Sequence, residues 1–163
     1  MNILDKIIID KKREVILKKS IIPVSQLEAS VFFGKKTISL SQNLRKSKSG
    51  IIAEHKRRSP SRAEINYSFT VEEVVKGYEN AGALLLARAS VNIPLLRKEF
   101  IVDEYQILEA KAHGADLILL IAAVLTREEI KSLSEFAKVL GLEVLLEVHN
   151  LEELQKSIMP TLD

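Results

Sequence analysis

Hydrophobic residues recur at helical spacing through the first part of the chain. In residues 1–19, isoleucines, leucines and a valine lie three or four positions apart among lysines, which predicts an amphipathic helix. Shorter helices are predicted at residues 26–33 and at residues 39–46, where Ser39 is a candidate N-cap. A helical arm therefore precedes the first predicted strand.

From residue 49 the pattern changes to short apolar runs separated by helical segments. Such runs are typical of strands that are covered on both faces. Their alternation with helices predicts an α/β fold with a parallel sheet and helices outside it. The predicted strands are Ser49–Lys56, Ala83–Leu86, Ile93–Lys98, Asp116–Ala122 and Leu142–His149.

Capping residues mark the starts of the helices that follow the later strands. Asp103 stands before one helical segment and Asn150 before another, and both residue types are preferred N-caps. Thr126 and Glu129 have the spacing of a capping box. These signals predict three helices with well-defined first turns.

The second and third predicted strands lie too close together for a parallel pair. Only Ala87–Asn92 separates them, whereas a crossover between neighbouring parallel strands needs about a dozen residues or more. Either residues 83–92 are not a strand and a loop, or a crossover unit is missing there. A continuous helix from Val71 through Arg88 is one solution, although Gly77 and Gly82 disfavour it.

Composition narrows the class of protein. The 163 residues are 47% hydrophobic and 28% charged, which is typical of one globular domain. The chain has no cysteine, so disulfides and thiolate chemistry are excluded. The longest apolar run, Leu117–Leu125, is too short to span a bilayer, and the first ten residues lack the apolar run of a signal peptide. We expect a cytoplasmic protein with no membrane partner.

Three predicted strands end in ionisable side chains, and parallel strands bring such ends to one rim. Charges that share a rim alter one another's pKa values and suit proton transfer or anion binding. The alternative interpretation is a solvated basic turn after an ordinary strand. The ionisable sets are Glu54 with Lys56, Lys98 with Glu99, and Glu147 with His149.

Other classes of site are less well supported. The three histidines are far apart and lack the spacing of metal ligands, so no metal site is predicted. No glycine-rich dinucleotide or phosphate loop is present. The basic run from Arg45 to Arg62 could hold phosphates, but aromatic residues are absent from it, which disfavours a nucleic-acid partner.

Four segments taken together resemble the indole-3-glycerol phosphate synthases of tryptophan biosynthesis. They are similar to the first-, third-, fourth- and fifth-strand signatures of that family, in order: Ile51–Ser61, Ile93–Ile107, Gly114–Leu125 and Leu142–His149. The resemblance implies a (β/α)8 TIM barrel that acts on a small phosphorylated substrate. It implies ring closure of 1-(2-carboxyphenylamino)-1-deoxy-D-ribulose 5-phosphate with loss of carbon dioxide and water, without a metal or organic cofactor.

The resemblance also implies roles for individual residues. Lys98 is expected to be the general acid that protonates the substrate carbonyl, and Glu147 its proton-transfer partner during dehydration. Lys56 is expected to hold the substrate carboxylate, and Glu54 to orient the lysines and the substrate amine. These four all belong to the ionisable sets at the predicted strand ends.

Two further residues are expected to bind the substrate without taking part in the chemistry. Ser59 is expected to contact the substrate near its phosphate, and Phe100 to form a wall of the pocket. His55 departs from the family pattern, which usually has an apolar or aromatic residue there.

The sequence also lacks segments that the family has. The second-strand segment, with the loop and helix after it, is missing near residues 86/87, which accounts for the short spacing. The sixth-strand signature and the final glycine-rich phosphate turn are absent. We therefore expect a helical extension over residues 1–48 and an incomplete barrel of about five strands over residues 49–163. The alternatives are a catalytically inactive barrel fragment and, with less support, a basic nucleic-acid-binding module.

Overall fold

A computed structural model of the chain describes residues 3–48, 50–52, 84, 87–89 and 91–163. The first predicted strand is described only at residues 50–52, which have no regular secondary structure. Ile51 and Ile52 are exposed there, in contrast to the buried strand that the sequence predicts. Glu54, Lys56 and Ser59 lie outside the described residues.

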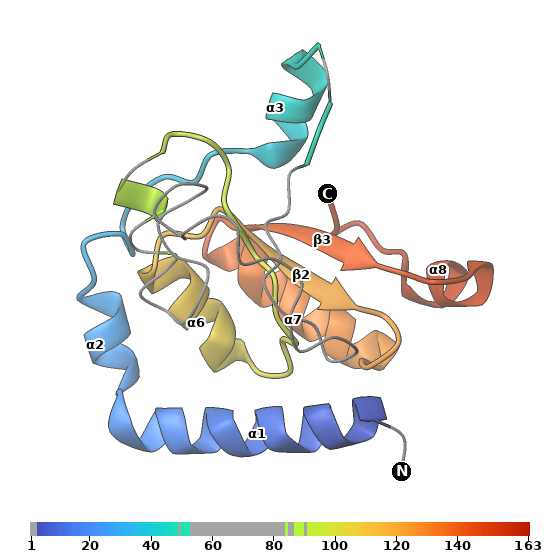
Figure 1. Ribbon diagram of the computed structural model, residues 1–163, viewed down its shortest axis with the longest axis horizontal. Coiled ribbons are helices and arrows are strands. Elements are labelled where there is room, and N and C mark those ends of the chain that lie inside the picture. The colour runs from blue at the N-terminus through green and yellow to red at the C-terminus, as the bar shows by residue number, and fades with distance from the viewer. Residues whose placement is uncertain (1–2, 49, 53–83, 85–86, 90) are drawn as a thin grey trace, which may run out of the picture.

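Helices and parallel strands alternate in the second half of the chain, as the sequence predicts (Figure 1). The predicted N-caps are confirmed at Ser39, Asp103, Thr126 and Asn150, and Thr126 forms its capping box with Glu129. The elements are α1 (Ile3–Ile21), α2 (Val24–Glu28), α3 (Leu40–Lys46), β1 (Leu96–Arg97), α6 (Glu104–Ala112), β2 (Leu117–Ile121), α7 (Arg127–Val139), β3 (Glu143–Glu147) and α8 (Leu151–Ser157).

The three described strands form a parallel sheet in the order β1-β2-β3. Arg97 pairs with Ile118 and Ile118 with Val144, so these residues share one face of the sheet. Ile121 pairs with Glu147, three strand positions after that set, and therefore lies on the opposite face. The face with Ile118 and Val144 packs into the hydrophobic core, whereas Glu147 at the strand end lies on the other face.

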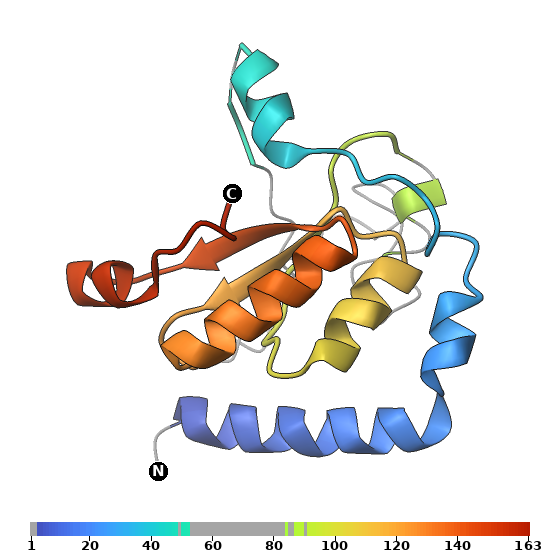
Figure 2. The same ribbon diagram turned by 180° about the vertical axis from the view of Figure 1, so that it is seen from behind.

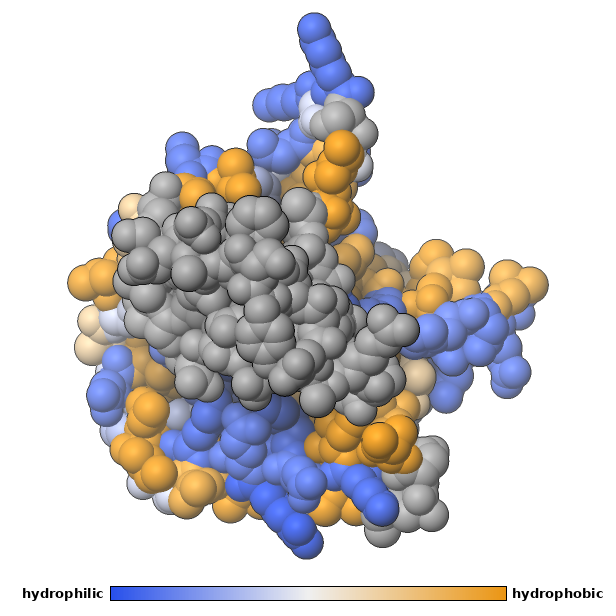
Figure 3. Space-filling view, in the orientation of Figure 1, coloured by the Kyte–Doolittle hydropathy of each residue, from blue (hydrophilic) through white to orange (hydrophobic). Residues whose placement is uncertain are grey.

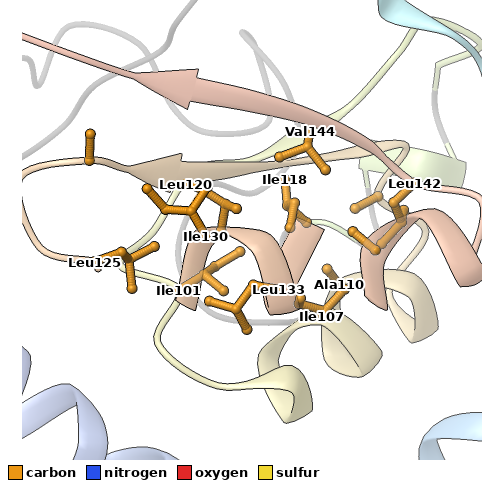
Figure 4. Packing of buried hydrophobic residues seen from close by; sticks show 13 residues of the cluster. Ile101, Ile107, Ala110, Ile118, Leu120, Leu125, Ile130, Leu133, Leu142 and Val144 are labelled. Atoms are coloured by element: carbon orange, nitrogen blue, oxygen red, sulfur yellow. The ribbon is translucent and has the colours of Figure 1, made fainter. Parts of the chain in front are cut away.

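The core lies between the sheet and the helices α6 and α7. Ile118 and Leu120 from β2 and Ile130 from α7 are fully buried, and Figure 4 shows them packed together with Val144 and Ile107. Burial of each such side chain stabilises the fold by about 1.5–3 kcal/mol. The continuous apolar run of β2 is therefore explained by cover on both faces, with all five residues buried.

The predicted strand Ala83–Leu86 is wrong at Leu84, its one described residue, because Leu84 is helical. Residues 87–89 are helical too, in agreement with the alternative of a helix that reaches Arg88. Ala87 is buried, and the Arg88 guanidinium donates to the carbonyl oxygens of Gly114 (3.0 Å) and Ile93 (3.1 Å). Leu84 packs against the core cluster. Because the described residues here are helical, a short strand-to-strand crossover is not required.

Helices α1 and α2 pack against α6 through a small second cluster. Val15 and Leu27 are buried against Tyr105 and Ala112. The Tyr105 hydroxyl donates to the carbonyl oxygen of Ile22 (2.9 Å). Helix α1 runs beneath α6 and α7 in both ribbon views (Figures 1 and 2).

Helices α2 and α8 are both short. Helix α2 is shorter than the predicted helix over residues 26–33, because the chain turns where the Ser30 hydroxyl donates to the carbonyl oxygen of Ala112. Near the C-terminal end, α8 projects from the body with both hydrophilic and exposed apolar residues (Figure 3), and Leu151 and Leu154 are among the apolar ones. Within the described parts of the chain, no helix combines the length and the apolar character needed to cross a membrane.

Helix α3 is anchored to the start of β3 by the carboxylate of Glu143. The carboxylate accepts hydrogen bonds from the backbone amides of Leu40 (2.7 Å) and Ser41 (3.0 Å) and from the hydroxyls of Ser39 and Ser41. Partial burial by itself raises the pKa of Glu143, but these hydrogen bonds outweigh it and hold the pKa below the usual 4.5. Glu143 is therefore more acidic in the folded chain than in the unfolded chain.

Replacing Glu143 with glutamine is expected to lower the free energy of unfolding by about 1–2 kcal/mol at pH 7, because the amide cannot accept as many charge-assisted hydrogen bonds. The contribution of Glu143 is present above its unfolded pKa and is lost as the pH falls through its lower folded pKa. The difference in stability between the variant and the unmodified chain should therefore be smaller at pH 3 than at pH 7. Urea unfolding at pH 7 and pH 3 measures both values, and an equal gap at the two pH values would contradict the assignment.

Candidate active site

Lys98, which follows β1, meets Glu147, the last residue of β3, and β2 lies between these two strands. The Lys98 Nζ atom is 3.5 Å from the Glu147 Oε2 atom. Lys98 follows Arg97 and so points away from the helix-covered face, and Glu147 lies on that same side. Two of the sequence-predicted residues, which lie on different strands, are thus neighbours.

The pair is accessible to a ligand. The side chains of Lys98 and Glu147 are 39% and 34% exposed. Ion pairs with that degree of exposure contribute about 0–1 kcal/mol to stability. The contact therefore has little structural value, and both groups remain available to exchange protons with a bound molecule.

His149 is a second neighbour of the Glu147 carboxylate. Its Nε2 atom is 3.5 Å from Glu147 Oε1, and its Nδ1 atom is 3.5 Å from Glu153 Oε2. The backbone amide of His149 donates to Glu153 (2.8 Å), and this bond is the main reason that the pKa of Glu153 is lowered. Glu147 thus lies between an ammonium group and an imidazole, a setting in which a carboxylate can accept and return a proton.

Glu99 does not join Lys98, although the two are adjacent in sequence and were grouped at one strand end. Its carboxylate instead contacts Arg97 Nε at 2.5 Å and Lys11 Nζ at 3.6 Å. Successive residues of an extended chain point to opposite sides, so a glutamate next to Lys98 cannot share its face. The expected grouping of Lys98 with Glu99 is therefore wrong.

Of the other predicted site residues, the structure describes Phe100 but not Glu54, Lys56 or Ser59. Phe100 is half-buried two positions after Lys98, and its carbonyl oxygen accepts a hydrogen bond from Gln106 (2.9 Å). Its role as a pocket wall stays a prediction, as do the roles of Glu54, Lys56 and Ser59.

Two hollows elsewhere on the described surface do not include the Lys98–Glu147 pair. One, of about 630 Å³, lies where Lys19 of α1 approaches α6 and α7. The other, of about 220 Å³, lies between the segment after α2 and the start of β2, next to Lys111. Among the residues that the structure describes, no group of histidine and carboxylate side chains is arranged to hold a metal ion.

Sequence reasoning missed the charged residues around Lys98. Arg97 and Glu109 are buried partners (3.0 Å) on the helix side of β1. A usable signal was present, because Glu109 stands between Leu108 and Ala110 in α6, and a carboxylate that is buried with such neighbours requires a cationic partner. The distance along the chain to that partner hides the pairing from local patterns.

A statistical model of the family described as "Indole-3-glycerol phosphate synthase" matches the chain in two segments, residues 4–87 and residues 83–162. The segments overlap at residues 83–87, next to the helical residues 87–89. Together they include nearly all of the described chain.

Curated proteins with the name "Indole-3-glycerol phosphate synthase" align with the chain over nearly its whole length. The protein from Bacteroides thetaiotaomicron is 44% identical over 171 residues, which cover 94% of this chain and 66% of that protein. One from Campylobacter jejuni is 40% identical over 183 residues (99% and 70%), and one from Neisseria meningitidis is 36% identical over 181 residues (95% and 68%). The chain thus spans about two thirds of the length of these relatives. Each alignment is longer than the 163-residue chain, so the relatives have residues without a counterpart here.

Proposed function

The chain belongs to the indole-3-glycerol phosphate synthase family, and from this we propose that the protein closes the indole ring of 1-(2-carboxyphenylamino)-1-deoxy-D-ribulose 5-phosphate. The observation that carries the proposal is the 3.5 Å contact between Lys98 and Glu147 from two non-adjacent strands. An acid and a base that meet at the strand ends of a parallel sheet are suited to proton transfer.

Lys98 supplies the proton in the first stage of the proposed reaction. The ring carbon that bears the carboxylate attacks the substrate carbonyl carbon, and Lys98 Nζ gives its proton to the carbonyl oxygen. The new carbon–carbon bond then allows carbon dioxide to leave, and the electrons of the broken bond restore the aromatic ring. The products of this stage are a hydroxyl group on the new ring and a deprotonated Lys98.

Glu147 acts in the second stage, the loss of water. The new hydroxyl leaves with a proton, and the five-membered ring gives up a proton as its double bond forms. Glu147 takes the proton from the ring and gives it to the leaving hydroxyl, so its own protonation is the same before and after this stage. The proton that Lys98 gave up in the first stage is restored from solvent, because loss of carbon dioxide from a carboxylate consumes one proton overall.

The remaining sequence-derived residues complete the proposed site. Lys56 holds the substrate carboxylate, Glu54 orients the lysines and the amine, Ser59 contacts the phosphate end, and Phe100 covers one side. In this proposal β1, β2 and β3 are consecutive strands of a TIM barrel, with residues 1–48 as a helical extension and residues 49–163 as the barrel part. The parallel order of the three strands, with a helix between each pair, supports this arrangement.

The direct test is an assay of the purified protein with the substrate and no added metal or cofactor. Indole fluorescence and mass spectrometry should detect indole-3-glycerol phosphate, with one carbon dioxide released per product. Folded protein, checked by circular dichroism, that releases neither product would refute the proposal and favour the inactive barrel fragment.

A further inference from the structure

Six charged side chains form a closed ring on the helix side of β1, opposite the side on which Lys98 meets Glu147. Three contacts within it are Arg97 with Glu99 (2.5 Å), Arg97 with Glu109 (3.0 Å), and Lys18 with Glu109 (3.3 Å). The other three are Lys11 with Glu99 (3.6 Å), Lys11 with Glu14 (2.6 Å), and Lys18 with Glu14 (3.1 Å). Lys11, Glu14 and Lys18 belong to α1. In order, the six-charge ring is Lys11, Glu99, Arg97, Glu109, Lys18 and Glu14.

The ring combines buried and half-exposed members. The Glu109 side chain is 2% exposed and that of Arg97 is 12% exposed. Partial burial lowers the pKa of Lys18, but Glu14 and Glu109 outweigh it, so the pKa is raised. Three positive and three negative charges balance, and ion pairs in such a network are stronger than isolated surface pairs.

Two members of the ring flank Lys98 in sequence, so the ring can affect the direction of the Lys98 side chain. Arg97 and Glu99 are the two immediate neighbours of Lys98. When the ring holds both of their side chains on the helix side, the backbone of Lys98 is fixed between them, and its side chain must leave toward Glu147. Lys98 itself has a flexible side chain in a half-exposed pair, which does not fix its own direction.

We propose that the six-charge ring positions Lys98, so that α1 sets the direction of the acid through Lys11 and Lys18. This inference rests on the proposed function for the role of Lys98 as the acid, but the geometry that it predicts is independent of turnover. Arg97, Glu99 and Glu109 are positioning residues, because they act through the backbone of Lys98 and do not face Glu147.

Helix α1 offers a matched pair of variants. Lys11→Gln removes the contact between α1 and Glu99. Lys19→Gln removes a different α1 ion pair, to Asp103 (2.8 Å), which does not involve β1. Lys11→Arg keeps the cation and is expected to behave as the unmodified chain. Thermal unfolding of all three checks that the fold is retained.

The first readout is the NMR signal of Lys98 in protein labelled with 13C at lysine Cε, assigned by its absence in Lys98→Arg. Glu147→Gln removes the neighbouring carboxylate and should displace this signal. In the Lys11→Gln background the displacement should fall by about half or more, because Lys98 spends less time beside Glu147. In the Lys19→Gln background it should be unchanged.

The second readout is turnover. We expect Lys11→Gln to lower kcat about 5- to 10-fold with little change in KM, since a misplaced acid affects the transition state more than substrate binding. A full displacement of the Lys98 signal in Lys11→Gln would overturn the inference, and so would an equal loss in Lys19→Gln. If no variant or unmodified protein turns over, the proposed function fails, while the NMR result still decides whether the ring positions Lys98.

Discussion

Lys98→Met is expected to lower kcat for ring closure by about 1,000-fold or more, because a general acid contributes about 10²- to 10⁴-fold to a rate. Methionine keeps the apolar stem of the side chain and removes the proton. The free energy of unfolding should change by less than about 1 kcal/mol, since the Lys98–Glu147 pair is more than one-third exposed on both sides. Steady-state kinetics and urea unfolding of the same preparation measure the two effects.

A second lysine serves as the control for this variant. Lys131 is paired with Glu135 on α7 at 3.9 Å, with 67% of its side chain exposed and no contact with the candidate site. Lys131→Met should leave both kcat and stability unchanged. Equal turnover in Lys98→Met and the unmodified protein would exclude Lys98 as the acid, and equal losses in both variants would indicate a general effect of removing a lysine.

The largest loss of stability is expected at Asp116, just before β2. Its side chain is 5% exposed and accepts hydrogen bonds from the backbone amides of Ile38 (2.7 Å) and Leu95 (2.8 Å) and from Arg88. Asp116→Ala would leave these buried donors, one of them charged, without their acceptor. We expect a loss of about 3–5 kcal/mol in the free energy of unfolding, measured by urea denaturation.

Two variants test whether this loss comes from the buried contacts. Burial raises the pKa of Asp116 despite the opposing effects of the two amides and Arg88, so a neutral side chain of the same shape is tolerated better than none. Asp116→Asn should therefore cost less than Asp116→Ala. Asp10→Asn alters an ion pair in which both side chains are more than 70% exposed and should cost under about 0.5 kcal/mol. A cost for Asp116→Ala as small as that of Asp10→Asn would refute the structural role.

The parts of the fold that depend on nearby residues could be predicted from the sequence. Ser39, Asp103 and Asn150 begin helices because each oxygen reaches an amide two or three residues ahead, which a local pattern records. The buried strand around Ile118 was also evident, because a continuous apolar run of that length requires cover on both faces.

What the sequence could not supply is the choice among distant partners. Lys98 and Glu147 were expected at one rim, but their contact depends on the register of three strands. Leu84 was assigned to a strand because a short apolar run fits a strand or a buried helix equally well. Glu109 is paired with Lys18 and Arg97. Both partners lie outside its own helix in sequence, so no local signal identifies them.

The contact between α3 and Glu143 has a consequence for the order of events during biosynthesis. Leu40 and Glu143 are separated by 103 positions along the chain. Helix α3 leaves the ribosome long before β3 exists, and seven residues are too few to be stable alone. It must therefore remain unanchored until more than a hundred further residues have been synthesised. Nascent chains arrested before Glu143 should expose α3 to protease, and chains arrested well after it should protect it.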